Sequence, residues 1–186
     1  MSRIIHFRER PLAITDVETT GLHPDKHEII EIGLVLADQK NGNILDTLDI
    51  KIKPSHIETA SPRALEINGY KPEDWTRAIS LQTAMKKYAT KAKNGLFCAH
   101  NITFDWGFIE KAFQTTGASH SMDYHRIDLL TIAWRELGPK GLDRLNLNSI
   151  AEFLGVPPEP KVHRGINGAM TEYLILKKIL WNTESN

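Results

Sequence analysis

The stretch Pro11-Leu-Ala-Ile-Thr-Asp-Val-Glu-Thr-Thr-Gly-Leu22 decides the fold of this chain. Alternate side chains of an extended strand share a face, so Leu12 and Ile14 should point to the same side as Asp16 and Glu18. The threonine–threonine–glycine run that follows breaks the strand. The sequence therefore predicts a buried strand that carries two carboxylates at its end.

The pattern on either side of this stretch predicts an α/β fold class. Two more strands follow, separated by a hairpin turn signal at 40–43, so the chain opens with three antiparallel strands. The second half alternates helix and strand, which predicts a central mixed sheet flanked by helices. We expect one domain over residues 1–186 with its core at about 11–181. The expected strands cover 11–18, 28–37, 44–52 and 96–99. One helix is expected to start near residue 61, and further helices are expected at 80–93, 103–116, 128–137, 147–154 and 167–181.

Composition excludes several classes of protein. The 186 residues include 23 Lys and Arg against 23 Asp and Glu, so the net charge is zero and a strongly basic surface is excluded. Any nucleic-acid contact should then be short and local. The single Cys98 cannot form an intramolecular disulfide, and a buried structural thiol is expected. No apolar run is long enough to cross a bilayer, and we expect a cytoplasmic location.

Asp16 and Glu18 form the first candidate site. Two carboxylates on a buried face repel each other and lose hydration, at a cost of several kcal/mol per ion unless something compensates. A divalent cation compensates well, and an all-oxygen ligand set favours Mg²⁺ or Mn²⁺ over zinc. The alternative is a strand end that lies in solvent with both carboxylates hydrated.

Asp105 and His163 extend this candidate site. Asp105 should lie in the first turn of a helix, on the same stripe as the apolar residues Phe108, Ile109 and Ala112. It could instead only stabilise the helix dipole. His163 follows a proline-rich loop, and histidine is the side chain best suited to move a proton near neutral pH. The alternative for His163 is a solvated loop histidine.

Taken in order, these segments resemble the DnaQ-like (DEDDh) 3′–5′ exonuclease family of the ribonuclease H-like superfamily. The resemblance covers most of the chain, from about residue 12 to 180, and it implies a ribonuclease H-like fold with a five-stranded mixed sheet. Asp-Val-Glu-Thr-Thr-Gly-Leu (16–22) with Ile-Ile-Glu-Ile-Gly (29–33) matches the first motif, and His-Asn-Ile-Thr-Phe-Asp-Trp-Gly-Phe-Ile (100–109) matches the second. Residues 127–130 and 147–151 resemble the family's usual helix starts.

The third motif departs from the family pattern, which has a histidine and then an aspartate five residues later. His163 matches, but Gly168 stands where the last metal-binding aspartate is expected, and Gly165 and Asn167 also differ. Glu172 lies one helical turn after Gly168 and could reach back toward the site. The alternative interpretation is that Glu172 lies on the solvated surface of a helix.

The resemblance implies hydrolysis of a terminal phosphodiester with two divalent cations, Mg²⁺ or Mn²⁺. Asp16 would bridge both ions, Glu18 would hold the ion that activates water, and Asp105 would support the second ion. His163 would take the proton from the attacking water. The residues implied to bind the 3′-terminal nucleotide are Thr19, Thr20, Gly21, Leu22, His100 and Asn101.

The resulting functional hypothesis is a 3′–5′ exonuclease that shortens single-stranded DNA or RNA to nucleoside monophosphates. Because Gly168 removes a charged ligand, we expect weaker metal binding, slower turnover and better rescue by Mn²⁺ than by Mg²⁺. The alternative is an inactive exonuclease fold that binds nucleic acid or a protein. The expected partners are single-stranded 3′ ends and, in addition, a DNA polymerase or a second copy of the chain, with no membrane.

Two further interpretations stay open from the sequence. His23 and His27 with Glu31 could hold zinc, although the i, i+4 spacing suits a helix and this region contains a proline and leads into a strand. The lysines within 86–87 and 91–93 could form a nucleic-acid track. Such a run is also typical of the solvated face of a helix.

Overall fold

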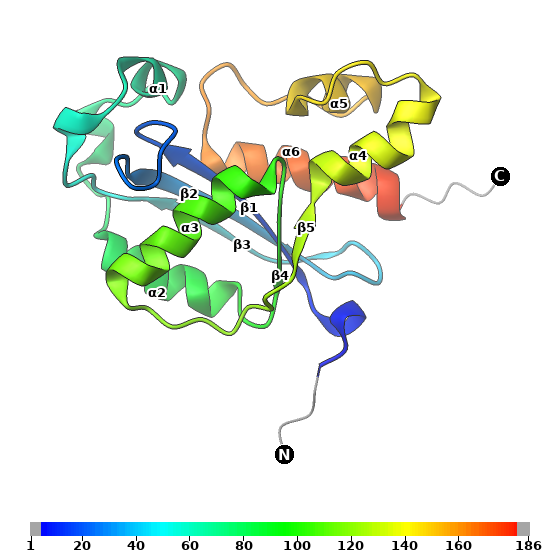
Figure 1. Cartoon of the computed structure of the whole chain (residues 1–186), viewed down its shortest axis with the longest axis horizontal. Helices are drawn as coiled ribbons and strands as arrows, with labels where there is room; N and C mark the ends of the chain where they lie inside the picture. The colour runs from blue at the N-terminus through cyan, green and yellow to red at the C-terminus, as the bar shows by residue number, and fades with distance from the viewer. Residues whose placement is uncertain (1–4, 182–186) are drawn as a thin grey trace.

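A five-stranded mixed sheet forms the centre of the protein, as the sequence predicts (Figure 1). The computed structural model describes residues 5–181. The strands lie in the order β3-β2-β1-β4-β5, with β1 antiparallel to β2, β2 antiparallel to β3, and β4 parallel to both β1 and β5. Their bounds are β1 Leu12–Thr19, β2 Ile29–Ala37, β3 Ile44–Lys51, β4 Leu96–Ala99 and β5 Arg126–Asp128.

The strand β5 is the element that the sequence pattern did not place. It has three residues, all half-buried, and it pairs with β4 from Phe97 opposite Arg126 to Ala99 opposite Asp128. Three residues are too few to show an alternating pattern, and Asp128 also caps the following helix by accepting from the Thr131 amide. The helix signal therefore concealed the strand.

Helices cover both faces of the sheet. On one face α2 and α3 pack against Ala13, Val17 and Ile32, while α4, α5 and α6 pack against Ile14 and Val35 on the other. Within the described residues, no helix combines the length and apolar character needed to cross a membrane. The helix bounds are α1 Pro62–Ile67, α2 Leu81–Lys91, α3 Ile102–Thr116, α4 Leu129–Leu137, α5 Leu147–Phe153 and α6 Gly165–Leu176, and α6 continues as a π-helical turn over Lys177–Trp181.

Two facing glycines let α6 lie directly on the sheet. Gly33 in β2 and Gly165 at the start of α6 are so close that a Cβ on Gly165 would lie 2.7 Å from the Gly33 nitrogen and 3.0 Å from the Asp16 carbonyl oxygen. A Cβ on Gly33 would overlap the Gly165 backbone. Gly165, which differs from the family pattern, therefore has a packing role. The helix α6 begins at Gly165, two residues before the expected residue 167.

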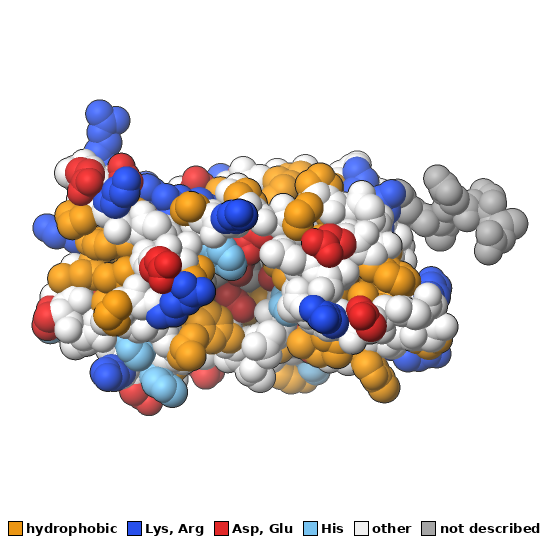
Figure 2. Space-filling model, turned by 90° about the horizontal axis from the view of Figure 1, so that it is seen from above, with side chains coloured by type: hydrophobic (Ala, Val, Ile, Leu, Met, Phe, Trp, Pro, Cys, Tyr) orange, Lys and Arg blue, Asp and Glu red, His pale blue; other side chains and the backbone are white. Residues whose placement is uncertain are grey.

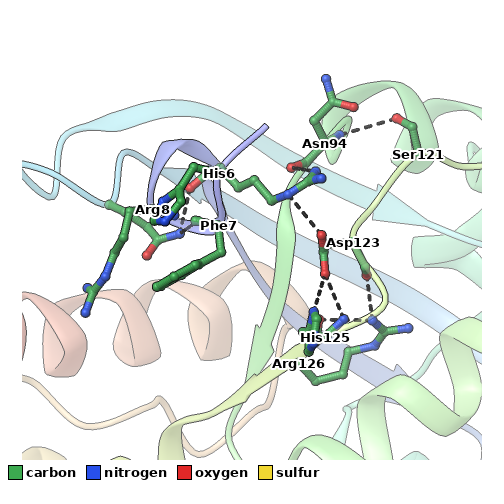
Figure 3. Close-up of polar contacts among 10 residues, drawn as sticks. His6, Phe7, Arg8, Asn94, Ser121, Asp123, His125 and Arg126 are labelled. Carbon is green, nitrogen blue, oxygen red and sulfur yellow. Dashed lines mark hydrogen bonds and ion pairs between the residues drawn. The ribbon is translucent and has the colours of Figure 1, made fainter. Parts of the chain in front are cut away.

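A polar network ties the chain together at the end of the sheet remote from β1's carboxylates (Figure 3). The Asp123 carboxylate pairs with Arg10 at 2.9 Å and accepts from the backbone and ring nitrogens of His125. Arg126 donates to the Asp123 carbonyl oxygen at 2.6 Å. These contacts join the residue before Pro11 to the segment leading into β5, and so hold the starts of β1 and β5 together.

Candidate active site

Two of the predicted acids, Asp16 and Glu18, line a cleft at the carboxyl ends of the parallel strands β1 and β4, and Asp105 is buried beside Val17, which also lines it. Figure 2 looks onto this side and shows a hollow with Asp, Glu and His side chains gathered in it. The cleft has a volume of about 410 Å³. It is lined by β1, the turn that follows, α1, α3 and the segment before α6, through Asp16, Val17, Glu18, Thr19, Gly21, Leu22, Ser61, Arg63, Ala64, Ile67, Asn68, Phe104 and His163.

Asp16 and Glu18 project from β1 on the face that packs against α6. Glu18 is only 6 % exposed, and a β-bulge follows it where pairing with β2 shifts register. Burial, and then the nearby carboxylates of Glu159, Glu31 and Asp105, raise the pKa of Glu18 to about 8. Burial and the Asp105 carboxylate raise the pKa of Asp16 well above its ordinary range. Both carboxylates are therefore in an environment that opposes their charge, rather than in open solvent.

Asp105 approaches the same place from the first turn of α3. It is 3 % exposed, and its Oδ1 accepts a 3.0 Å hydrogen bond from the Val17 amide, the residue between the two β1 acids. This bond fixes the side chain across the sheet edge. Burial raises the pKa of Asp105 to about 7, although the Val17 hydrogen bond acts in the opposite direction. The apolar stripe around Asp105 thus buries it as the sequence predicts. Its carboxylate accepts from the Val17 amide, so its role is not limited to stabilising the dipole of α3.

His163 reaches the cleft from the segment before α6, and it meets an acid that the sequence analysis did not single out. Its Nδ1 lies 3.4 Å from Oε2 of Glu159 in the proline-rich loop. Burial lowers the pKa of His163. Burial likewise raises the pKa of Glu159 to about 7. Glu18, Glu159 and His163 each offer a ligand atom, and these three atoms all lie within 4.8 Å of one another.

Gly168 leaves a space on α6 that Asp16 enters. A Cβ at position 168 would lie 2.4 Å from Oδ2 of Asp16 and 2.6 Å from its carboxyl carbon. The Asp16 carboxylate therefore lies where an aspartate side chain at 168 would begin. A larger residue at this position requires Asp16 to turn away.

Glu172 is buried beside the site, which corrects the alternative of a solvated helix surface. It is 1 % exposed, and Oε1 accepts a 2.9 Å hydrogen bond from the His100 amide. Its Oε2 is buried and has no hydrogen-bond partner among the described residues. Burial and the Asp105 charge raise its pKa well above the usual range. Glu172 contributes to the charge of the site from one turn beyond Gly168.

Glu31 is a buried acid on the neighbouring strand, directly opposite Glu18 in the β1–β2 ladder. Its Oε2 accepts from the Gly165 amide at 3.2 Å, and its Oε1 lies 3.6 Å from Nη1 of Arg164. Arg164 also donates to the carbonyl oxygen of Asn68 and lowers the pKa of Glu18 and Glu31. Glu31 and Arg164 thus hold the start of α6 and place one positive charge at the edge of the acidic cluster.

The six predicted nucleotide-binding residues divide into two groups. Thr19, Gly21 and Leu22 line the cleft, and the Leu22 side chain is 73 % exposed, so an apolar surface faces solvent beside the carboxylates. Thr20 does not line it, because its side chain is fully buried and its Oγ1 accepts from the Glu28 amide. The β1–β2 connection uses this hydroxyl, and the alternating pattern did not reveal that.

His100 and Asn101 also lie outside the residues that line the cleft. The His100 amide binds Glu172, and its ring Nε2 lies 2.7 Å from the Leu145 carbonyl oxygen. Asn101 is exposed with a left-handed backbone, φ 57°, at the turn into α3. In this structure His100 positions Glu172, and neither His100 nor Asn101 lines the cleft with Asp16 and Glu18.

The alternative zinc site is not assembled. His23 and His27 stack with ring centroids 5.9 Å apart, but Nδ1 of His27 accepts from the His23 amide. Glu31 binds the start of α6 instead. Within residues 5–181, Glu18, Glu159 and His163 are the three potential ligands close enough to share an ion.

The basic residues of α2 favour the interpretation as a solvated helix face. Figure 1 shows α2 beside α3, with which it packs on one face of the sheet, whereas Asp16 lies against α6 on the other face. Lys86, Lys87 and Lys93 are exposed, and Lys91 pairs with Asp46 of β3. None of these lysines lines the cleft that Asp16 and Glu18 line.

The sequence analysis missed Glu159 because a loop acid between prolines shows no periodicity. A signal was nevertheless available. The run Pro157-Pro158-Glu159-Pro160 fixes three of its four backbone φ angles near −65°, and such a loop can hold one side chain in a set direction. A charged residue in that position, four residues before the predicted histidine, could have been included among the candidates.

Comparison with known proteins identifies the class that this fold and cleft define. Residues 13–176 match the family model of the exonuclease domain RNase_T. The chain belongs to this exonuclease family, and its fold is that of the DnaQ-like, ribonuclease H-like 3′–5′ exonucleases.

Curated relatives in sequence are much longer proteins. A DNA polymerase III of the PolC type from Thermotoga petrophila is 32 % identical over 165 residues, which cover 88 % of this chain and 11 % of the polymerase. The corresponding protein of Thermotoga maritima is 31 % identical over the same share of each chain. The chain thus spans about a ninth of the length of these relatives.

Solved structures agree in fold. The zinc-bound form of an E. coli exonuclease I–ssDNA complex superimposes with a TM-score of 0.79 at 18 % identity, covering 94 % of this chain and 41 % of the other. A 3′-exonuclease described in 3′-end-specific recognition of a histone mRNA stem-loop gives 0.75 at 18 % identity, covering 96 % and 67 %. These likenesses establish the ribonuclease H-like architecture.

Proposed function

We propose that the chain is a metal-dependent 3′–5′ exonuclease acting on single-stranded DNA or RNA ends and releasing nucleoside monophosphates. The observation that supports the proposal is that Asp16, Glu18 and His163 line one cleft, with Asp105 buried behind it on the amide of Val17. A single domain over the chain and a cytoplasmic location remain predictions. So does a polymerase or a second copy as partner, the former supported by the PolC-type relatives.

The residues present fit a divalent cation. The donors are carboxylate oxygens, which Mg²⁺ and Mn²⁺ prefer, and buried oxygens of Glu159 and Glu172 lack hydrogen-bond partners within the described chain. Asp16, Glu18 and Asp105 would hold the metal. Bound there, it would supply the positive charge that stabilises a phosphodiester undergoing attack.

The other residues would bind substrate and move protons. Nδ1 of His163 faces Glu159, which leaves Nε2 as the atom to accept a proton from the attacking water. Burial lowers the pKa of His163 and so favours the neutral imidazole, the form that accepts a proton. Leu22 and the backbone of residues 19–21 would hold the terminal nucleotide by apolar and amide contacts, which read no sequence.

The test is degradation of a 5′-labelled single-stranded oligonucleotide in Mg²⁺ and in Mn²⁺. Stepwise shortening from the 3′ end by the wild type, absent in Asp16→Asn, is the expected result, with Mn²⁺ supporting the faster rate. Oligonucleotide binding without cleavage in either metal would overturn the exonuclease and favour a binding module. The absence of a side-chain carboxylate at position 168 is the observation that favours this second candidate function, the binding module.

Gly168→Asp separates the two candidates further. It restores a carboxylate on α6, but Asp16 must turn out of the space that the new Cβ takes. If the wild type binds without cleaving and Gly168→Asp cleaves, then the lost aspartate alone accounts for the inactivity.

A further inference from the structure

The proposed metal centre lacks one charged ligand, and the structure contains a carboxylate placed to supply it. Position 168 on α6 carries no side chain. Glu172, one turn further along, has one oxygen committed to the His100 amide. The loop before α6 offers Glu159, whose carboxylate is grouped with Glu18 and His163 within 4.8 Å.

We propose, on the basis of the function proposed above, that Glu159 is a metal ligand of this centre and provides the carboxylate missing at position 168. The ligand would come from the loop that precedes α6 instead of from α6 itself. It would share a divalent cation with Glu18, with His163 at the edge of the same group.

The burial of Glu159 is an independent observation in favour of a ligand. Its side chain is 7 % exposed, and its Oε1 is buried with no hydrogen-bond partner among residues 5–181. An ionised carboxylate that loses hydration without a compensating partner costs several kcal/mol. Oε2 has the His163 ring at 3.4 Å, and a hydrogen bond from the Arg164 backbone amide also favours the ionised carboxylate, but Oε1 has no partner among the described residues. A cation would satisfy both Glu159 and Glu18.

The loop also holds Glu159 in place. Its backbone amide donates a 3.1 Å hydrogen bond to Oδ1 of Asn148 in α5, and prolines precede and follow it. These restraints direct the side chain into the site before any ion binds. Preorganised ligands of this kind lose little conformational entropy on binding.

The charge pattern agrees with this assignment. Glu159 and Glu18 each place a carboxylate oxygen within 4.8 Å of the other and of a His163 ring nitrogen. Two carboxylates that repel each other at this range form an arrangement that a divalent cation would stabilise.

The test measures Mn²⁺ binding directly, by electron paramagnetic resonance of free Mn²⁺ titrated into the full chain without nucleic acid. Glu159→Gln keeps the shape of the side chain and removes its charge. The expected result is a Kd raised about tenfold or more relative to the wild type. Glu152→Gln, an exposed acid of the neighbouring α5, is the matched control and should bind Mn²⁺ as the wild type does.

A second readout distinguishes a ligand from a structural residue. In chelator, Glu159→Gln should unfold at the same temperature as the wild type or higher, because it removes a buried charge beside Glu18. Mn²⁺ should raise the unfolding temperature of the wild type more than that of the variant. A residue that only supports the loop, or only orients His163, would leave the Mn²⁺ affinity unchanged.

The possible outcomes separate the two proposals. If the wild type binds Mn²⁺ and Glu159→Gln binds it within about twofold, the assignment of Glu159 is wrong while the metal-dependent function stands. If the wild type binds no Mn²⁺ at millimolar concentration, both proposals are overturned. A loss of affinity in Glu159→Gln that Glu152→Gln does not share supports the assignment.

Discussion

The repulsion between carboxylates in the cleft is clearest at Glu18. It lies beneath the Glu159 carboxylate and opposite Glu31 in the sheet, and Asp105 adds to the repulsion. Arg164 offsets part of this repulsion. In the absence of metal, protonation is the remaining way to relieve it. The cleft should therefore make the stability of the protein depend on pH.

We expect Glu18→Gln to stabilise the metal-free protein more at pH 8 than at pH 5. The folded pKa of Glu18, about 8, lies above the ordinary value, so the folded state binds more protons than the unfolded state between these pH values. In the wild type, the contribution of Glu18 to the free energy of unfolding is complete at low pH. It is lost as the pH rises through the pKa of Glu18 in the folded state. Glutamine does not undergo this loss.

The measurement is thermal unfolding in chelator from pH 5 to pH 8, with Glu152→Gln as the control for removal of an exposed acid. The difference in unfolding temperature between Glu18→Gln and the wild type should grow steadily over this range. A difference that is constant or shrinks with pH would contradict the raised pKa.

At the scale of elements, the contact between α6 and the sheet positions the third motif. Gly165 begins α6 against Gly33, and its amide binds the Glu31 carboxylate. His163 lies two residues earlier in the same segment. The close approach of backbone to backbone therefore sets where the histidine enters the cleft.

Gly165→Ala should lower the free energy of unfolding by roughly 1–3 kcal/mol, because the new Cβ meets backbone atoms of β1 and β2 that cannot move aside. Gly138→Ala is the matched control, since a Cβ there meets no atom within 4 Å. Urea unfolding of both variants makes the comparison. Equal stability in the two would refute the tight packing of α6, and a shifted α6 should also slow any nuclease activity.

For the whole molecule, the balance of charge limits how nucleic acid can be held. The net charge is zero, and none of the lysines within 86–93 lines the cleft. Arg63 lines the cleft and Arg164 lies beside Glu31. Backbone and apolar contacts at residues 19–22 would then supply most of the affinity.

Binding of a labelled single-stranded oligonucleotide should accordingly depend weakly on salt. With only about two phosphates neutralised, the slope of log K against log salt should be no steeper than about −2. Fluorescence anisotropy between about 50 and 200 mM salt, with Asp16→Asn to prevent cleavage, measures it. A slope of about −5 or steeper would show an extended basic track that the structure does not suggest.

Sequence pattern was sufficient for the elements that repeat a period. The alternation in 11–18 located β1, and the apolar stripe around Asp105 correctly placed that acid against the core. The order of the motifs predicted the five-stranded sheet and the exonuclease family, both confirmed. The strand β5 escaped because three residues are too few to show an alternating pattern.

Side-chain direction outside regular elements was decided only by the tertiary structure. Thr20 and Asn101 match a motif, yet the turn after β1 uses the Thr20 hydroxyl and the turn into α3 leaves Asn101 exposed. Glu172 was left open between two interpretations, and the packing of α6 against the sheet buried it beside the His100 amide.

The sequence by itself determined which strand ends in carboxylates and which helix brings a third one, because local periodicity fixes which face each residue occupies. The tertiary structure alone decided that Glu159 joins them and that Asp16 fills the space beside Gly168. The reason is physical: a loop has no period, and the distance between groups far apart in the chain depends on how closely the backbones pack.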